Sequence, residues 1–194
     1  MDDFKRISVY PGIQYSGIHY QVAFNNPTSY PFVGAGAQGA VFLLTSEQCV
    51  KIYALHDEAL RETNALASVQ GSAFFPKLYE SGPNYNVMEF IKGPSLDQFL
   101  HDANRLDFHL TCQLVDLFEE MNNLNLSRID AALRHLFLTE SQTLKVIDHV
   151  NSFQTVSSYP KLLLTELNSL GLLSAFLEQV KSYKPYLLRE WSIL

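Results

Sequence analysis

The fold is decided by the stretch Val33-Gly34-Ala35-Gly36-Ala37-Gln38-Gly39-Ala40-Val41 and by Val50-Lys51-Ile52-Tyr53, which follows it closely. Three of the nine glycines in the chain lie within six residues here. Glycine tolerates positive φ and has no Cβ, so a loop of this composition can bring backbone N–H groups close to a phosphate. The residues after the glycines indicate which kind of phosphate loop this is.

Those residues favour strands. Ala40 to Leu44 and Cys49 to Tyr53 are apolar runs rich in strand formers, separated by a polar turn, which predicts a hairpin. In a dinucleotide-binding fold the last glycine would open a helix, and an acidic residue about twenty positions later would follow a strand. Asp57 or Glu58 lies at that distance, but no strand precedes it. The dinucleotide site is therefore the less favoured alternative.

Composition narrows the class of protein. The chain has 194 residues, enough for one domain or two small lobes, and a formal charge of −6 argues against broad nucleic-acid binding. No apolar run approaches the roughly twenty residues of a membrane span, and residues 1–6 lack a signal-peptide pattern. The two cysteines, Cys49 and Cys112, are isolated, which fits a reducing compartment and predicts a cytoplasmic protein.

The segment after the hairpin predicts a helix and two further strands. The helical pattern runs from His56 to Gln70, with Leu60 on the expected apolar face and Glu62 in the middle. Two strands are expected over Phe74–Tyr79 and Tyr85–Ile91, joined by a Gly-Pro turn.

The second half of the chain is expected to be mainly helical. Ser95 is a credible N-cap for a helix through about Ala103, and a stronger helix is predicted over Leu106–Leu124. Two more short helices are expected over Leu162–Leu173 and Ala175–Tyr183, with Trp191 closing the core.

Between these helices, two short strands joined by a polar turn are each flanked by an acid. The first strand follows Asp130, and the second ends at Asp148, 18 residues later. Phosphoryl transfer needs a carboxylate near the acceptor hydroxyl and hard oxygen ligands for Mg²⁺, so this pair of acids suits that chemistry.

Together the glycine hairpin, the strand lysine and the two acids resemble the protein-kinase-like superfamily, in particular its minimal members such as RIO-type atypical kinases and small bacterial serine/threonine kinases. The resemblance covers roughly Val33 to Val150. It implies an α+β, two-lobed fold: residues 1–91 would form a small antiparallel-sheet lobe with one helix, and residues 92–194 a reduced, mainly helical lobe with the catalytic hairpin.

The resemblance implies that the first lobe binds ATP. The glycine hairpin would cover the phosphates, and Lys51 would reach them, held by Glu62 or by its rival Glu58 one turn earlier. The expected nucleotide-binding residues are Gly34, Gly36, Gly39, Val41, Lys51, Met88 behind the adenine, the backbone of Glu89 to Ile91 at its edge, and Asp97 at the ribose.

It also implies roles for the two acids. Asp130 would orient or deprotonate the acceptor, and Asp148 would bind Mg²⁺. The sequence departs from the family pattern in four places. Arg128-Ile129 stands where the family has His-Arg before the aspartate, and His149-Val150 stands where it has Phe-Gly after the second aspartate. Ala132 replaces a lysine, and His135 replaces the asparagine that holds the second ion. Imidazole is a poor Mg²⁺ ligand, so His135 could favour Mn²⁺, or the site could hold one ion or none.

Two hypotheses follow. The first is an ATP-dependent phosphotransferase that acts on a hydroxyl of a protein or small molecule, with ATP and Mg²⁺ or Mn²⁺ as cofactors, and with Lys51, Glu62 and Asp130 in the catalytic role. The second is a pseudokinase that serves as a nucleotide-binding or scaffold module. Neither hypothesis involves a nucleic acid or a membrane, and the sequence indicates no acceptor and no oligomeric state.

Overall fold

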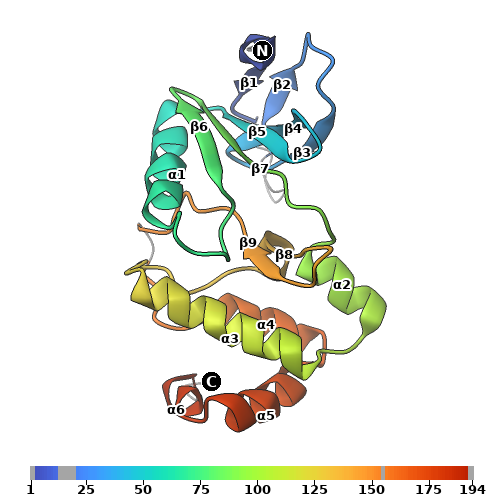
Figure 1. The fold of residues 1–194 in the computed structure, drawn as a ribbon, viewed down its shortest axis with the longest axis vertical. Helices are drawn as coiled ribbons and strands as arrows, with labels where there is room; N and C mark the ends of the chain where they lie inside the picture. Colours follow the sequence, from blue (N-terminus) through green and yellow to red (C-terminus); the bar gives the residue numbers. More distant parts are fainter. Residues whose placement is uncertain (1–2, 13–20, 154–155, 192–194) are drawn as a thin grey trace. The chain divides into compact units, whose positions relative to one another are not determined.

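The computed structural model describes residues 3–12, 21–153 and 156–191 (Figure 1). The chain divides into two compact units, and each is described by itself. Unit 1 comprises Met1–Gln70 and Pro76–Phe90. Unit 2 comprises Gly71–Phe75 and Ile91–Leu194.

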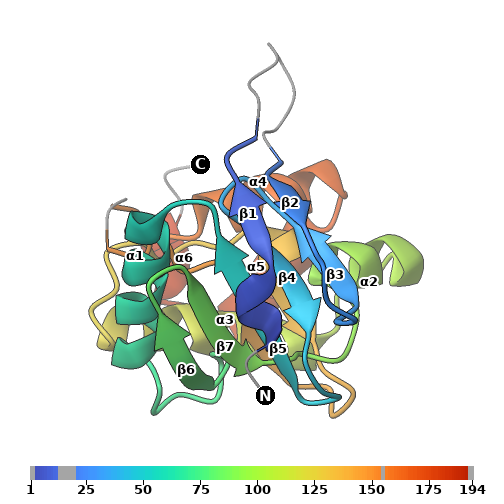
Figure 2. The ribbon, with the colours of Figure 1, turned by 90° about the horizontal axis from the view of Figure 1, so that it is seen from above.

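Unit 1 is built on a five-stranded antiparallel sheet with strand order β3-β4-β5-β7-β6 (Figure 2). The strands are β3 (Phe32–Ala35), β4 (Gly39–Leu43), β5 (Gln48–Tyr53), β6 (Leu78–Gly82) and β7 (Tyr85–Glu89). The predicted hairpin is confirmed, because β4 pairs with β5 in a register that sets Val41 opposite Lys51.

The N-terminal segment adds a short 3-10 helix, η1 (Asp3–Arg6), and a separate pair of strands, β1 (Ser8–Tyr10) and β2 (Ala23–Asn25). The sequence pattern predicts two short strands here, over Ile7–Tyr10 and Ile18–Phe24. Strand β1 matches the first and β2 overlaps the end of the second, whose residues 18–20 lie outside the described residues. Phe4 is buried and packs edge-on against the Tyr85 ring, which ties η1 to the sheet.

Helix α1 (His56–Ser68) packs against β5, β6 and β7 of unit 1 (Figure 1). Its buried side chains are Ala59, Glu62, Ala65 and Leu66. The sequence-based placement of Leu60 on the buried face is wrong, since this side chain is 50% exposed. The buried line instead includes a glutamate, which apolar periodicity does not count.

The expected strand over Phe74–Tyr79 is wrong for its first four residues, because β6 begins at Leu78. Pro76 has no N–H and cannot continue a ladder. The Phe74 carbonyl accepts a hydrogen bond from the amide of Val146, and the Phe75 carbonyl accepts one from Lys145. These bonds place Gly71–Phe75 within unit 2.

Unit 2 is mainly helical. Its helices are α2 (Leu96–Ala103), α3 (Phe108–Asn123), α4 (Lys161–Ser169), α5 (Leu173–Tyr183) and α6 (Leu187–Trp191). The first four are close to the expected segments, whereas α6 was not expected as a helix. Helix α4 ends early, before Gly171, whose φ of 72° a helix cannot continue.

The predicted cap and the predicted core residue of unit 2 are confirmed. The Ser95 side chain accepts a hydrogen bond from the Gln98 amide, and the Gln98 side chain completes a capping box. Trp191 is buried and stacks on Phe176, which joins α6 to α5. Lys184, after α5, forms an ion pair with Asp116 of α3.

A short hairpin completes unit 2. Strands β8 (Leu136–Leu138) and β9 (Leu144–Val146) pair in antiparallel register, preceded by the 3-10 turn η2 (Leu133–His135). The chain is therefore α+β, and its five-stranded antiparallel sheet with several helices is compatible with a small kinase-like fold. In the part of the chain that the structure describes, no helix is long and apolar enough to cross a membrane.

Candidate functional site

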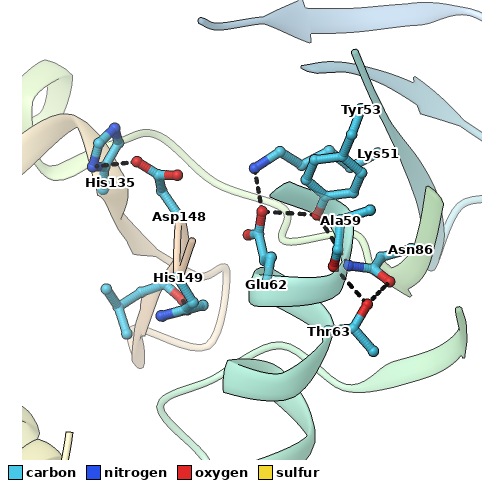
Figure 3. Close-up of polar contacts among 10 residues, drawn as sticks. Lys51, Tyr53, Ala59, Glu62, Thr63, Asn86, His135, Asp148 and His149 are labelled. Atoms are coloured by element: carbon cyan, nitrogen blue, oxygen red, sulfur yellow. Dashed lines mark hydrogen bonds and ion pairs between the residues drawn. The ribbon is translucent and has the colours of Figure 1, made fainter. Parts of the chain in front are cut away.

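The strand lysine of unit 1 is held by a buried glutamate. Lys51 Nζ lies 2.5 Å from Glu62 Oε2, with side-chain exposures of 14% and 3% (Figure 3). Of the two candidate glutamates, Glu62 is therefore the one that pairs with Lys51. The two charges of a buried pair stay in contact, because a charge that is separated from its partner would have neither water nor an opposite charge to stabilise it.

The Glu62 carboxylate is held by more than the lysine, and sequence reasoning missed this. Tyr53 donates its hydroxyl proton to Glu62 Oε2 at 2.7 Å, and the Asn86 amide donates to the Tyr53 oxygen at 3.0 Å. Thr63 in turn donates to Asn86 Oδ1 at 2.7 Å (Figure 3). The one sequence signal was Asn86 itself, a polar residue between apolar neighbours in β7.

The three glycines of the loop have different surroundings. A Cβ on Gly39 would lie 2.5 Å from the Ile52 carbonyl oxygen, so Gly39 is required by the close approach of β5. At Gly34 and Gly36 a Cβ would meet no atom within 4 Å, and neither has a positive φ. Neither packing nor backbone conformation requires glycine there. A Cβ at either position would fill only open space beside the hairpin.

Of the residues expected at the adenine, Met88 is buried and the backbone amide of Glu89 already has a hydrogen-bond partner. Met88 is buried in a small apolar cluster with Cys49 and Leu66, and burial raises the pKa of the Cys49 thiol to about 12. The amide of Glu89 donates to the Lys77 carbonyl, so this N–H is already used within the sheet.

Two further expected nucleotide contacts belong to unit 2. Ile91 begins the longer segment of that unit, and Asp97 lies in the first turn of α2. Both are half-buried. A carboxylate at the start of a helix also interacts favourably with the helix dipole, whatever else it binds.

Asp130 has a structural partner that the sequence did not suggest. Its carboxylate accepts hydrogen bonds from the backbone amides of Leu162, at 2.9 and 3.1 Å, and of Leu163, at 3.4 Å. It therefore caps the N-terminus of α4. Burial raises the pKa of Asp130, and these amides and Arg128 oppose that shift.

His135 and Asp148 lie together in unit 2. His135 Nδ1 is 3.6 Å from Asp148 Oδ2, and both side chains are about one quarter exposed, at 21% and 26% (Figure 3). Asp148 has a φ of 70°, a left-handed conformation that is uncommon for a residue other than glycine. Positions held in such a conformation cluster at functional sites.

A small cavity in unit 2 is lined by residues that include Asp130, His135 and Asp148. The three side chains that the sequence marked as site candidates in this unit thus line one cavity. Its volume is about 10 Å³, which admits roughly one water-sized sphere.

The pocket offers few metal ligands of its own. Among the described residues, no group of three or more His, Cys, Asp or Glu side chains is arranged to hold a metal ion. An ion at His135 and Asp148 would therefore need additional oxygen ligands from water or from a ligand such as a phosphate. His149, which follows Asp148, is buried against the Phe75 ring and bonds the Val146 carbonyl, so it acts as a packing residue.

An antiparallel sheet with a buried lysine–glutamate pair beside a glycine hairpin, in a chain that also carries an Asp-flanked hairpin, is compatible with a kinase-like protein. Comparison with known proteins agrees at this coarse level. The chain is 29% identical over 128 residues to a Bacillus subtilis (strain 168) protein named "Putative serine/threonine-protein kinase YrzF". The match covers 63% of this chain and 60% of that protein's length. No protein-family model matches the chain.

Proposed function

We propose that this protein is an ATP-dependent phosphotransferase of the kinase-like type, which moves the γ-phosphoryl group to a hydroxyl of a protein or small molecule. Unit 1 is the small lobe of this proposal and unit 2 the reduced helical lobe. The observation that carries it is the buried pair of Lys51 and Glu62 beside a glycine hairpin that has open space at Gly34 and Gly36.

In unit 1 the residues are suited to bind a nucleoside triphosphate. Lys51 carries a compact positive charge at 14% exposure, and Glu62 fixes its position from behind. The Gly36 amide already donates to the Gly39 carbonyl, so other backbone N–H groups of the glycine hairpin would supply the donors that phosphates accept. Positioning and charge stabilisation account for most of catalysis in phosphoryl transfer, so a fixed lysine is the feature to expect.

In unit 2 the residues fit a divalent ion bound together with phosphate. Asp148 provides a hard oxygen ligand and His135 a nitrogen ligand, 3.6 Å apart. A bound Mg²⁺ or Mn²⁺ would neutralise negative charge on the β- and γ-phosphate oxygens. Asp130 lines the same pocket, and its raised pKa is a change in the direction that favours a general base.

A second candidate is a nucleotide-binding pseudokinase, and one observation favours it. The Asp130 carboxylate accepts hydrogen bonds from Leu162 and Leu163, so it has a structural task as the cap of α4. A carboxylate has about four acceptor positions, so the cap alone does not prevent it from also accepting a substrate hydroxyl proton. Both candidates require nucleotide binding through Lys51.

The test is calorimetric titration with ATP in the presence of Mg²⁺ or Mn²⁺, followed by an assay for ADP formation with and without hydroxyl acceptors. We expect binding that weakens at least tenfold in Lys51→Met. The exposed lysine variant Lys5→Met is the matched control and should bind as the wild type does.

The two candidates separate in the turnover assay. ADP formation that Asp130→Asn abolishes supports the phosphotransferase. ATP binding with no turnover, unchanged in Asp130→Asn, supports the pseudokinase. Absence of ATP binding with either metal would overturn both.

A further inference from the structure

A buried hydrogen-bonded chain lies behind Lys51 and Glu62 in unit 1. We propose that Tyr53 and Asn86 are positioning residues that hold the Glu62 carboxylate, and through it the Lys51 ammonium, in the geometry that receives the nucleotide phosphates. This inference rests on the proposed function for the role of Lys51. It adds two residues to that site that no sequence motif marks.

The sheet register explains why these side chains meet. Lys51 and Tyr53 are two residues apart in β5, so they project from the same face of the sheet. Asn86 is directly opposite Lys51 in the neighbouring strand β7, which puts its side chain on that face too. Helix α1 covers this face and contributes Glu62 and Thr63.

The direction of each hydrogen bond follows from the partners. The Thr63 hydroxyl lies 2.7 Å from Asn86 Oδ1 and 2.8 Å from the Ala59 carbonyl oxygen, so these two acceptors share its one proton. The Asn86 amide nitrogen faces the Tyr53 oxygen. The Tyr53 oxygen thus accepts from Asn86, and its own proton points to Glu62 Oε2. Asn86 and Tyr53 therefore both donate in the direction of the carboxylate, an arrangement in which successive hydrogen bonds strengthen one another.

Burial makes this arrangement rigid. Tyr53 is 1% exposed, Asn86 0% and Glu62 2%. Rotation of the carboxylate away from Tyr53 would leave polar groups without partners in a place that water does not reach, which is costly. A single bond to Lys51 would fix only a distance; two donors on the same oxygen, Lys51 and Tyr53, also fix the orientation of the carboxylate.

A purely structural role is the competing explanation, since buried networks also stabilise folds. The two explanations differ in what removal of the Tyr53 hydroxyl changes. Tyr53→Phe keeps the ring, which packs 5.0 Å from Lys51 Nζ, and deletes only the donor to Glu62. Tyr85→Phe is the matched control, because it deletes a hydroxyl that donates to Glu80 from the same sheet, away from Lys51.

The experiment measures ATP affinity by calorimetry in the presence of divalent metal, and also records the ¹H–¹⁵N signal of the Lys51 ammonium without nucleotide. We expect Tyr53→Phe to weaken ATP binding about five- to tenfold and to accelerate solvent exchange of the Lys51 ammonium protons, because the carboxylate loses one of its constraints. Tyr85→Phe should change neither quantity.

Wild-type affinity for ATP in Tyr53→Phe overturns the inference and leaves the proposed function intact, whether or not the variant is less stable. No ATP binding by the wild type overturns the proposed function and this role with it. Should Tyr53→Phe fail to fold, Thr63→Val tests the same chain one bond further away. It should weaken ATP binding about two- to threefold, and unchanged affinity there contradicts the inference.

Discussion

His135 Nδ1 lies 3.6 Å from Asp148 Oδ2 in unit 2, so a nitrogen and an oxygen donor stand where one ion could contact both. Mg²⁺ prefers oxygen ligands, whereas Mn²⁺ also accepts imidazole. We therefore predict that the wild type binds ATP more tightly with Mn²⁺ than with Mg²⁺. His135→Asn should reduce that preference about tenfold, as seen in paired titrations with the two metals.

The controls test whether the metal preference depends on His135 as a ligand or on the loss of any histidine. His101→Asn changes an exposed histidine near the end of α2 and should leave the metal preference unchanged. Asp148→Asn should weaken metal-dependent binding with both ions. An unaltered Mn²⁺ to Mg²⁺ ratio in His135→Asn would show that His135 is no ligand.

The buried ion pair of unit 1 predicts a stability effect that needs no nucleotide. Lys51→Met leaves Glu62 buried without its cation, which should lower the free energy of unfolding by about 3 kcal/mol. Lys5→Met breaks an exposed pair with Glu80, at 41% and 49% exposure, and should cost at most about 1 kcal/mol. Urea denaturation of both variants measures the difference, and equal losses would contradict the burial argument.

Much of the fold could be predicted from local patterns, but side-chain partners across the chain could not. Periodicity and turn residues located α1, α2, α3 and the hairpin of β4 and β5. The same periodicity put Leu60 inside, because it gives no weight to a buried glutamate; Glu62 is in the core only because Lys51 and Tyr53 bond it. Asp130 caps a helix 32 residues further along the chain, and a cap at that separation depends on packing that no local pattern encodes.

Alanine substitutions at two glycines of the hairpin should differ in their effect on the free energy of unfolding. In Gly39→Ala the new Cβ would lie 2.5 Å from the Ile52 carbonyl oxygen, so strands β4 and β5 must shift, at a cost of about 1–3 kcal/mol in unfolding free energy. Gly36→Ala meets no atom within 4 Å and should leave stability within about 0.5 kcal/mol of the wild type.

Gly36→Ala, which should barely change stability, should nevertheless weaken nucleotide binding. The methyl group that Gly36→Ala introduces would occupy space beside the loop that we assign to phosphate. The substitution should therefore weaken ATP binding about tenfold, or by about 1.4 kcal/mol. Calorimetry on the folded variant measures this. A Gly36→Ala protein that is stable and binds ATP normally would remove the glycine hairpin from the proposed site.

Asp130 predicts a pH dependence of stability with a definite sign. Burial raises the pKa of this carboxyl above its ordinary value of 3.8, so the folded state holds the proton more tightly than the unfolded chain does. The stability that this group contributes is then greatest below about pH 3.8 and is lost as pH rises through the folded pKa. Asp130→Asn cannot ionise and removes that loss.

Urea denaturation of the wild type and Asp130→Asn between about pH 3.5 and pH 7 tests this sign. The asparagine variant should become progressively more stable relative to the wild type as pH rises. Asp130→Ala also deletes the cap of α4. This loss should lower the free energy of unfolding by about 1 kcal/mol at any pH. A difference between wild type and Asp130→Asn that stays constant with pH would mean that burial does not govern this carboxyl, and the support for Asp130 as a base would be lost with it.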